Sequence, residues 1–283
     1  MYSGDFASDL RAAIGAVARL PFEGDQVVDV LRGIEPTAAN DPNDEDHTTF
    51  WLVVADQFAK RGISSERVRE KAIEIIDQGT DIEMLARLGM APILLEKRRT
   101  VLRELRGRIA APASNTKKRV VLKKPQAFVM ECGEAFIYPT SQGQCINSYF
   151  PSKLRIPNWR QDSWSAAIIV DAGRAFGFLA WYRPVTLLTA SAEKPDFAQM
   201  RLIAPWVLRR PGTCSPVHFK RMELEKVGTL PVEIGKLKAL FPEMKHGTYQ
   251  AVNDISIVNE LSVRPERGLS SYPIIAKLDS ILS

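Results

Sequence analysis

The sequence predicts an α+β protein with a helical N-terminal domain over residues 1–110, a basic linker over 111–126 and a β-rich domain over 127–283. The β-rich domain is expected to be a strongly curved antiparallel sheet or partial barrel. Hydrophobic residues recur at helical spacing in the first third, and later form short apolar runs between glycines and prolines. The charge also changes sign: residues 1–112 hold 15 Lys+Arg and 19 Asp+Glu, whereas residues 113–283 hold 23 and 14.

The composition is that of a globular protein. The chain has 283 residues, of which 45% are hydrophobic and 25% charged, and this length suits domains of about 150 residues each. Three cysteines, Cys132, Cys145 and Cys214, are too few and too scattered for a disulfide framework, which favours a reducing compartment. The N-terminus lacks a signal-peptide pattern, and no apolar run approaches the ~18 residues of a spanning helix. We therefore expect a cytoplasmic protein that does not enter a membrane.

Five or six short helices are expected in the N-terminal domain. The first has an apolar stripe at helical spacing, made by Phe6, Leu10, Ile14, Val17 and Leu20. Thr48 or Thr49 is expected to cap a helix that ends at Gly62, and Thr80 with Glu83 has the spacing of a capping box. The expected helices cover residues 5–20, 25–31, 50–61, 65–78, a short stretch from 80, and a last one from Pro92.

Two polar segments allow two interpretations each. The loop 38–49 clusters carboxylates that either hold a hard cation or favour the positive end of the next helix. Its sequence lacks the EF-hand glycine and glutamate, and His47 beside it is expected to be a cap or surface residue. The linker is either a solvated tether or a phosphate-contacting run, with Lys117, Lys118, Arg119, Lys123 and Lys124 as its cations.

Strands are predicted from residue 127 onward. A hairpin is expected where Ser165–Asp171 and Ala175–Tyr182 flank the short connection at residues 172–174, and Pro139 and Pro184 are expected to interrupt strands. The other expected strands are 127–131, 135–138, 206–209, 226–232 and 248–257, with helices at 233–240 and near the end of 272–282.

Known catalytic and metal-binding patterns are absent from the sequence. Cys214 and His218 are four residues apart, but no CxxC or HExxH pair accompanies them, and neither a GxSxG motif nor a phosphate-binding glycine loop occurs. No metal and no cofactor is therefore predicted. One enzymatic hypothesis stays open, a cysteine-dependent reaction in which Cys145 or Cys214 is activated by a histidine.

Aromatic and basic residues alternate near predicted strand ends and form the candidate binding surface. They either engage a protein partner, stack bases and neutralise phosphates of a nucleic acid, or belong to the core and the sheet edges. The candidate residues are Trp159, Arg160, Trp164, Arg183, Arg209 and Arg210.

Two stretches resemble known bacterial families. Residues 50–85 resemble uncharacterised helical-domain proteins with an IID-G-DL pattern, matched here by residues 75–82, although Tyr2–Ala7 departs from their usual opening. Residues 132–139 are similar to the first strand of β-rich immunity proteins from polymorphic-toxin systems, with Glu134 in place of the usual aspartate. This second resemblance implies a non-enzymatic bacterial protein that neutralises a toxin by binding it.

Overall fold

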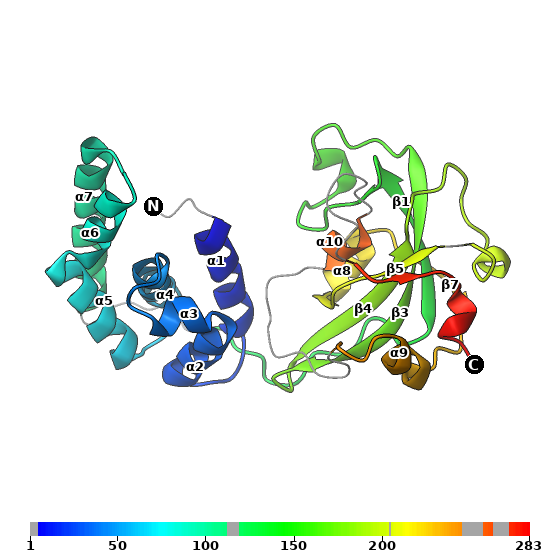
Figure 1. The fold of residues 1–283 in the computed structure, drawn as a ribbon, viewed down its shortest axis with the longest axis horizontal. Helices are drawn as coiled ribbons and strands as arrows, with labels where there is room; N and C mark the ends of the chain where they lie inside the picture. Colours follow the sequence, from blue (N-terminus) through cyan, green and yellow to red (C-terminus); the bar gives the residue numbers. More distant parts are fainter. Residues whose placement is uncertain (1–4, 112–118, 204, 245–256, 263–271) are drawn as a thin grey trace. The chain divides into compact units, whose positions relative to one another are not determined.

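The computed structural model describes residues 5–111, 119–203, 205–244, 257–262 and 272–283. The chain divides into two compact units, the first ending at Lys123 and the second beginning at Lys124. The first unit is helical, and the second is built on an antiparallel sheet (Figure 1). The predicted α+β class with a curved antiparallel sheet is confirmed, and the sheet is open rather than closed into a barrel.

The first unit packs around α4. The helix contacts α1, α3, α5, α6 and α7, and every residue from Phe50 to Phe58 is buried. A helix buried on all sides belongs to a core, unlike an amphipathic surface helix. The helices described in this unit are α1 Asp5–Val17, α2 Gly24–Ile34, α3 Pro36–Asn40, α4 His47–Arg61, α5 Glu66–Gln78, α6 Thr80–Arg87 and α7 Pro92–Ala110.

The helix stops were predicted better than the helix starts. Gly62 and Gly79 end α4 and α5 with φ values of 63° and 74°, a left-handed conformation that glycine adopts without steric cost. The predicted capping box at Thr80 is wrong, because Gly79 is the N-cap and the Thr80 hydroxyl donates to the Ile75 carbonyl. The predicted cap at Thr48 or Thr49 is also wrong, since α4 already begins at His47.

A buried ion pair joins three helices of the first unit. Arg98 on α7 donates from Nε and Nη2 to the two carboxylate oxygens of Asp81 on α6, at 2.8 and 2.9 Å. The hydroxyl of Thr48 on α4 donates to the same carboxylate at 3.1 Å. The side chains of Arg98 and Asp81 are only 8% and 1% exposed. Because each charge is removed from water, each depends on the other for compensation.

The described end of the linker is attached to the first unit. The Arg119 guanidinium donates to the carbonyls of Ala18, Leu20 and Phe22 just beyond α1, at 2.6 to 2.8 Å. The Leu122 amide donates to the Arg19 carbonyl at 2.8 Å. Arg119 therefore fixes this end of the linker to the first unit and is not part of a solvated tether. Lys117 and Lys118 lie outside the described residues.

The second unit contains one eight-stranded sheet of order β2-β1-β3-β4-β5-β8. Two further strands pair off this path, β6 with β4 and β7 with β1, and every pairing is antiparallel. The strands are β1 Glu134–Ser141, β2 Gln144–Cys145, β3 Ser163–Ala175, β4 Leu179–Leu187, β5 Trp206–Leu208, β6 Gly212–Thr213, β7 Glu225–Thr229 and β8 Ile274–Ile275. The described helical segments are η1 Lys153–Arg155, η2 Phe197–Gln199, α8 Pro216–Arg221, α9 Ile234–Leu240, α10 Ile257–Leu261 and η4 Leu278–Ser280.

The predicted hairpin exists, but its turn lies further along the chain. Ala175 pairs with Leu179, and the turn uses Phe176 and Gly177 at φ values of 52° and 73°. Residues 172–174, predicted as the connection, belong to β3. Gly173 marks no turn, because it pairs with Trp181 inside the ladder. The turn predicted from Gly173 therefore lies too early in the chain.

Two prolines predicted to end strands lie inside them. Pro184 of β4 pairs with Ile169 at the edge of a register shift that leaves Val170 as the extra residue of a bulge. Pro139 of β1 pairs with Trp164 on one side, between the stretches of β1 that pair with β7 and with β2. Both positions are places where a strand tolerates a missing amide donor.

Both faces of the sheet are covered. One hydrophobic cluster holds Ile137, Ile168 and Val185 with residues of α9 and the C-terminal segment. A second cluster holds Phe136, Ala167 and other sheet residues with Met222 and residues of α10. Neighbouring residues of a strand point to opposite faces, so β1, β3 and β4 contribute to both clusters. Figure 1 shows α8 and α10 beside the sheet and α9 at another side of it.

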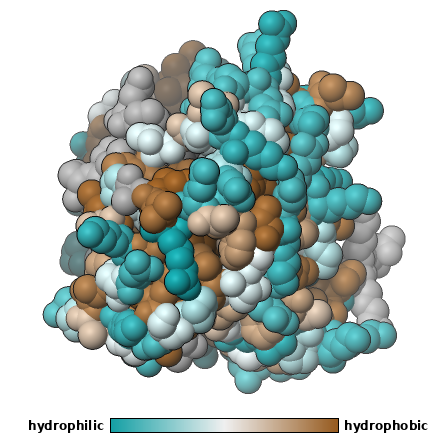
Figure 2. Space-filling view, turned by 90° about the vertical axis from the view of Figure 1, so that its right-hand side faces the viewer, coloured by the Kyte–Doolittle hydropathy of each residue, from teal (hydrophilic) through white to brown (hydrophobic). Residues whose placement is uncertain are grey.

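Some apolar side chains of the second unit are exposed near the first cluster. Figure 2 shows hydrophobic side chains gathered between hydrophilic ones on the side of the second unit that carries α9, β7 and the C-terminal segment. Exposed apolar residues of these and nearby segments are Leu202, Ile234, Leu240 and Ile274. Single exposed apolar side chains are common on proteins.

Other predicted elements shift or change type. Residues 127–131 form no strand, and the strand predicted at 226–232 is β7, which ends at Thr229. The strand predicted at 248–257 lies outside the described residues except for Ile257, which begins α10. The helix expected near the chain end is the single 3-10 turn η4, preceded by β8.

We expect Asp81→Asn to destabilise the first unit strongly, because it leaves the Arg98 guanidinium buried without its charge partner. Removing one partner of a buried pair costs about 3–5 kcal/mol. Chemical denaturation of the full chain, followed by helical circular dichroism, measures the change. Asp77→Asn is the matched control, since it breaks the Arg106–Asp77 pair, whose side chains are 44% and 46% exposed. An equally small midpoint shift for both variants would contradict the prediction.

Gly133→Ala is expected to destabilise the second unit more than Gly177→Ala. Both residues have positive φ, 89° and 73°, so alanine at either costs roughly 1–2 kcal/mol of backbone strain. A Cβ at Gly133 would also lie 2.4 Å from the Leu230 carbonyl oxygen, whereas one at Gly177 meets nothing within 4 Å. The added clash is worth about 1–3 kcal/mol. Thermal melts of the two variants measure the difference, and equal melting temperatures would refute the close approach of the two backbones.

Candidate functional site

Two of the six predicted binding residues are buried, which corrects their assignment as surface anchors. Arg183 is 4% exposed and Arg209 is 5% exposed. Arg209 donates from Nε to the Thr186 hydroxyl at 2.8 Å, and Arg183 has Nη1 3.8 Å from the Met244 sulfur. Both lie at the β4–β5 region of a sheet that is covered on both faces, so the six residues do not form one exposed surface.

Arg210 belongs to a polar cluster that ties the end of β5 to α10. Its backbone amide donates to the Glu260 carboxylate at 3.0 Å, and the guanidinium carbons of Arg209 and Arg210 lie 5.1 and 5.6 Å from the Tyr272 ring centroid. Burial raises the pKa of Glu260, while the Arg210 amide and the two guanidinium charges oppose that shift. This arrangement holds α10 against the sheet, so Arg210 has a structural role here.

The two predicted tryptophans are both half-buried but serve different parts of the unit. Trp164 packs against the first hydrophobic cluster, with the Lys194 ammonium 5.3 Å from its ring centroid. Trp159 lies under the Lys153 ammonium at 5.8 Å, and no partner for its buried indole N–H lies among the described residues. Arg160 is exposed, and its backbone amide donates to the Ser141 hydroxyl. Lys153, which contacts the Trp159 ring, also lines a groove that was not predicted from the sequence.

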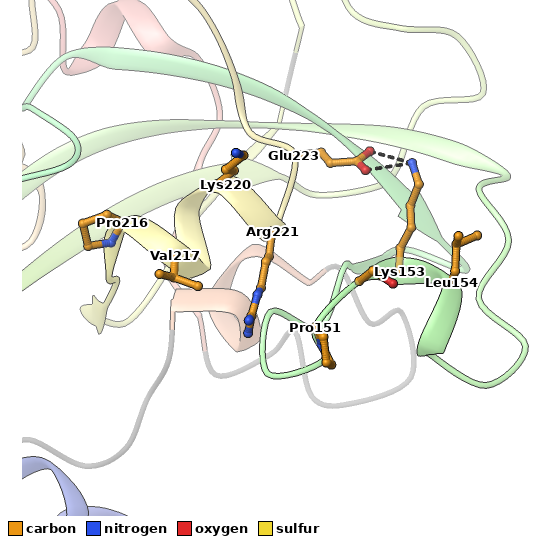
Figure 3. Close-up of a pocket in the computed structure, with 9 residues that line it drawn as sticks. Pro151, Lys153, Leu154, Pro216, Val217, Lys220, Arg221 and Glu223 are labelled. Carbon is orange, nitrogen blue, oxygen red and sulfur yellow. Dashed lines mark hydrogen bonds and ion pairs between the residues drawn. The ribbon is translucent and has the colours of Figure 1, made fainter.

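That site is a groove between the η1 loop and α8, with a volume of about 580 Å³. Figure 3 shows its two walls, with Arg221 extending from α8 toward the loop that carries Pro151. The lining residues are Pro151, Ser152, Lys153, Leu154, Pro216, Val217, Lys220, Arg221 and Glu223.

The α8 wall is built by local sequence signals. The Ser215 hydroxyl accepts a hydrogen bond from the His218 amide and caps the helix, and Pro216 occupies its first turn, where no amide donor is needed. Residues three and four apart share one face of a helix. Val217, Lys220 and Arg221 have this spacing, so one apolar and two cationic side chains line the groove together.

Side-chain contacts tie the α8 wall to the loop wall. The Lys153 ammonium bonds both carboxylate oxygens of Glu223, each at 2.8 Å. Arg221 donates from Nη1 to the Ser148 carbonyl at 3.1 Å. The rings of Tyr149 and His218 meet edge to face with centroids 4.9 Å apart. These contacts join the two walls of the groove.

The lining combines positive charge with exposed apolar surface. Lys153, Lys220 and Arg221 face a single acid, Glu223, among the lining residues. No hydrogen bond or ion pair engages the side-chain ammonium of Lys220 within the described part of the chain. Leu154 and Val217 are 91% and 55% exposed, so the groove presents aliphatic side chains to water between its cations. Such a surface suits a ligand that brings both apolar contact and negative charge.

The cysteines lack the surroundings of a nucleophile. Burial raises the pKa of the Cys214 thiol to about 12 and that of Cys145 still further. Cys132 is exposed, but partial burial of its sulfur and the charge of Asp171 raise its pKa as well. A raised pKa keeps the thiol protonated near neutral pH, whereas catalysis needs the thiolate. These findings give no support to the cysteine-dependent enzyme.

Neither the acidic loop nor His47 shows the surroundings of a metal site in the described part of the chain. His47 is 6% exposed and lies inside α4 after the N-cap Asp46, with Nδ1 2.8 Å from the Ala38 carbonyl oxygen. It is therefore neither the cap nor the surface residue that was predicted. Burial and the neighbouring charges of Asp44 and Glu45 raise the pKa of Asp46. In the ranges that the structure describes, no three His, Cys, Asp or Glu side chains are grouped so that they could hold a metal ion.

Comparison with known proteins gives no relative: no family model, no curated protein and no solved structure matches this chain. The groove and its chemistry are thus the basis on which a function can be argued. No helix among the described residues combines the length and the apolar character needed to cross a membrane.

The groove residues were not predicted from the sequence around α8. Cys214 and His218 drew attention as a thiol and an imidazole four residues apart, whereas Ser215 and Pro216 are the helix-start signal that matters. A helix predicted from that signal would have placed Lys220 and Arg221 each beside Val217, at spacings of three and four residues. The η1 loop gives no comparable signal apart from Pro151.

We expect iodoacetamide to label only Cys132 in the native 283-residue chain, and only slowly near neutral pH. Its raised pKa keeps the thiolate fraction low, so the labelling rate should still increase as pH rises above the ordinary thiol value of about 8.5. Peptide mass spectrometry before and after unfolding measures the reaction, with Cys145 and Cys214 as internal controls that react only after unfolding. Rapid labelling of either buried thiol in the native chain would revive the enzymatic hypothesis.

Proposed function

We propose that this chain is a non-enzymatic binding protein whose second unit holds an acidic segment of a protein partner in the groove between the η1 loop and α8. The observation that carries the proposal is the lining itself. Three cations and one acid surround exposed aliphatic side chains, at the two sides of a depression of about 580 Å³. A carboxylate-bearing segment with an apolar side chain matches this lining in charge and in character.

The geometry of the cations supports a peptide ligand. Arg221 is positioned by its bond to the Ser148 carbonyl, and an ordered guanidinium binds a carboxylate with less loss of side-chain freedom than a mobile one. Lys220 also lines the groove and is exposed. Leu154 lies on the opposite wall and offers an apolar contact. An acidic residue on each side of one aliphatic anchor would engage both walls.

The partner class follows from the resemblance to immunity proteins of bacterial polymorphic-toxin systems. On that basis we propose that the partner is a bacterial toxin and that binding neutralises it. The three free cysteines fit the reducing conditions of a cytoplasm, where an immunity protein of this kind would act. The second unit is not required to perform chemistry in this role.

Nucleic-acid binding is the alternative, favoured by the excess of Lys+Arg over Asp+Glu in residues 113–283. Part of that positive charge is not available to phosphates. Arg119 is occupied by three carbonyls near α1, and Arg183 and Arg209 are buried. The remaining exposed cations include Lys123 and Lys124. A protein ligand is therefore the stronger proposal.

We expect the 283-residue chain to bind a fluorescent Glu-Glu-Leu-Glu-Glu peptide. The substitutions Lys220→Glu and Arg221→Glu are each expected to weaken this binding roughly tenfold. Replacing a cation by an acid puts like charges together, and about 1.4 kcal/mol corresponds to one factor of ten. Fluorescence anisotropy measures the affinity at two salt concentrations. Lys238→Glu is the matched control, because Lys238 lies exposed on α9 and makes the same change in net charge.

Two further peptides test the chemistry of the ligand. Gln-Gln-Leu-Gln-Gln removes the charge, and Glu-Glu-Ser-Glu-Glu removes the apolar anchor, so each is expected to bind more weakly. A short DNA duplex tests the alternative. Equal weakening of peptide binding by Lys220→Glu, Arg221→Glu and Lys238→Glu would show that the groove is not a docking site for an acidic segment. The same conclusion would follow if no peptide binds, while DNA binds tightly and its binding is unchanged by Lys220→Glu.

A further inference from the structure

Glu223 is the one acidic residue among those that line the groove. It follows α8 directly and has a φ of 54°, a left-handed conformation that glycine or asparagine adopts more readily than glutamate. The α8 end fixes this geometry, since the Met222 and Glu223 amides donate to the carbonyls of His218 and Lys220. The resulting direction of the chain brings the Glu223 carboxylate to Lys153 on the opposite wall (Figure 3).

We propose that Glu223 is an internal substitute for an acidic side chain of the partner. In the free protein its carboxylate holds the Lys153 ammonium, and an acidic residue of the bound segment takes its place. The inference rests on the proposed function, because it assigns a regulating residue to the same groove. Glu223 then determines which segments bind, since a ligand must displace a carboxylate that is already present.

The exposure of the pair permits this exchange. The side chains of Lys153 and Glu223 are 39% and 43% exposed, so water reaches both partners and the pair is weak, as exposed ion pairs are. Replacing one carboxylate by another around the same ammonium changes little in hydration. The internal carboxylate has the advantage of being tethered beside Lys153. A segment with a single acidic residue competes poorly, whereas one that also engages Lys220 and Arg221 gains enough to displace it.

The test compares Glu223→Asn with wild type in binding Glu-Glu-Leu-Glu-Glu. Asparagine tolerates the left-handed backbone and removes the charge, and it is expected to raise the affinity about three- to fivefold, the range that loss of a competing exposed pair allows. Glu225→Gln is the matched control, because Glu225 forms a similarly exposed pair with Lys194 and does not line the groove. It makes the same change in net charge and should leave the affinity nearly unchanged.

A double-mutant cycle with Lys153→Ala separates competition from simple repulsion between Glu223 and the peptide. If Glu223 competes for Lys153, the gain from Glu223→Asn largely disappears when Lys153 is absent. An equal gain in both backgrounds would mean repulsion alone and would overturn the inference. Equal binding by wild type and Glu223→Asn would overturn the inference but leave the groove as a docking site. Failure of both proteins to bind the peptide would overturn both proposals.

Discussion

The burial of the sheet on both of its faces is the constraint on which the second unit depends. Side chains of β1 alternate between two hydrophobic clusters, with Ile137 in one and Phe136 in the other. One cluster is completed by α9 and the C-terminal segment, the other by α10 and residues next to α8. Among the described residues, the central strands β1, β3 and β4 of such a sheet present little open surface to a macromolecule. A docking site must lie at its periphery, where loops and short helices leave side chains partly in water.

This constraint also determines what polar side chains on the sheet do. Tyr138 is fully buried and donates its hydroxyl to the Leu261 carbonyl on α10 at 2.8 Å, and the Ser262 hydroxyl accepts a hydrogen bond from the Cys145 amide. In the same region, Arg209 donates to the Thr186 hydroxyl on β4, and the Glu260 carboxylate on α10 accepts from the Arg210 amide. Polar groups inside a protein are retained where they find partners, so these residues attach α10 to the sheet. Arg209 and Arg210, which look like part of a binding surface in sequence, belong here to that attachment.

The sequence was informative where local physics decides. Glycines with positive φ ended α4 and α5 as predicted, and the change of hydrophobic period separated the helical part from the sheet. Predictions failed where the outcome depends on distant residues. Pro184 stays within β4 because a bulge in β3 accommodates it, and Asp81 is a buried charge because Arg98 on another helix reaches it. The ion pair across the groove joins Lys153 and Glu223, which are 70 positions apart, and no local sequence pattern predicts it.

The ion pair of Asp81 with Arg98 and that of Lys153 with Glu223 differ in what their surroundings allow. Asp81 and Arg98 are almost fully buried, so separating them leaves charges without water or partner, and the pair acts as a fixed joint between helices. Lys153 and Glu223 remain about two-fifths exposed, so either can exchange its partner for water or for another charge at little cost. Only a pair of the second kind can respond to a ligand. Its location across a groove lined by further cations makes exchange with an external carboxylate the natural response.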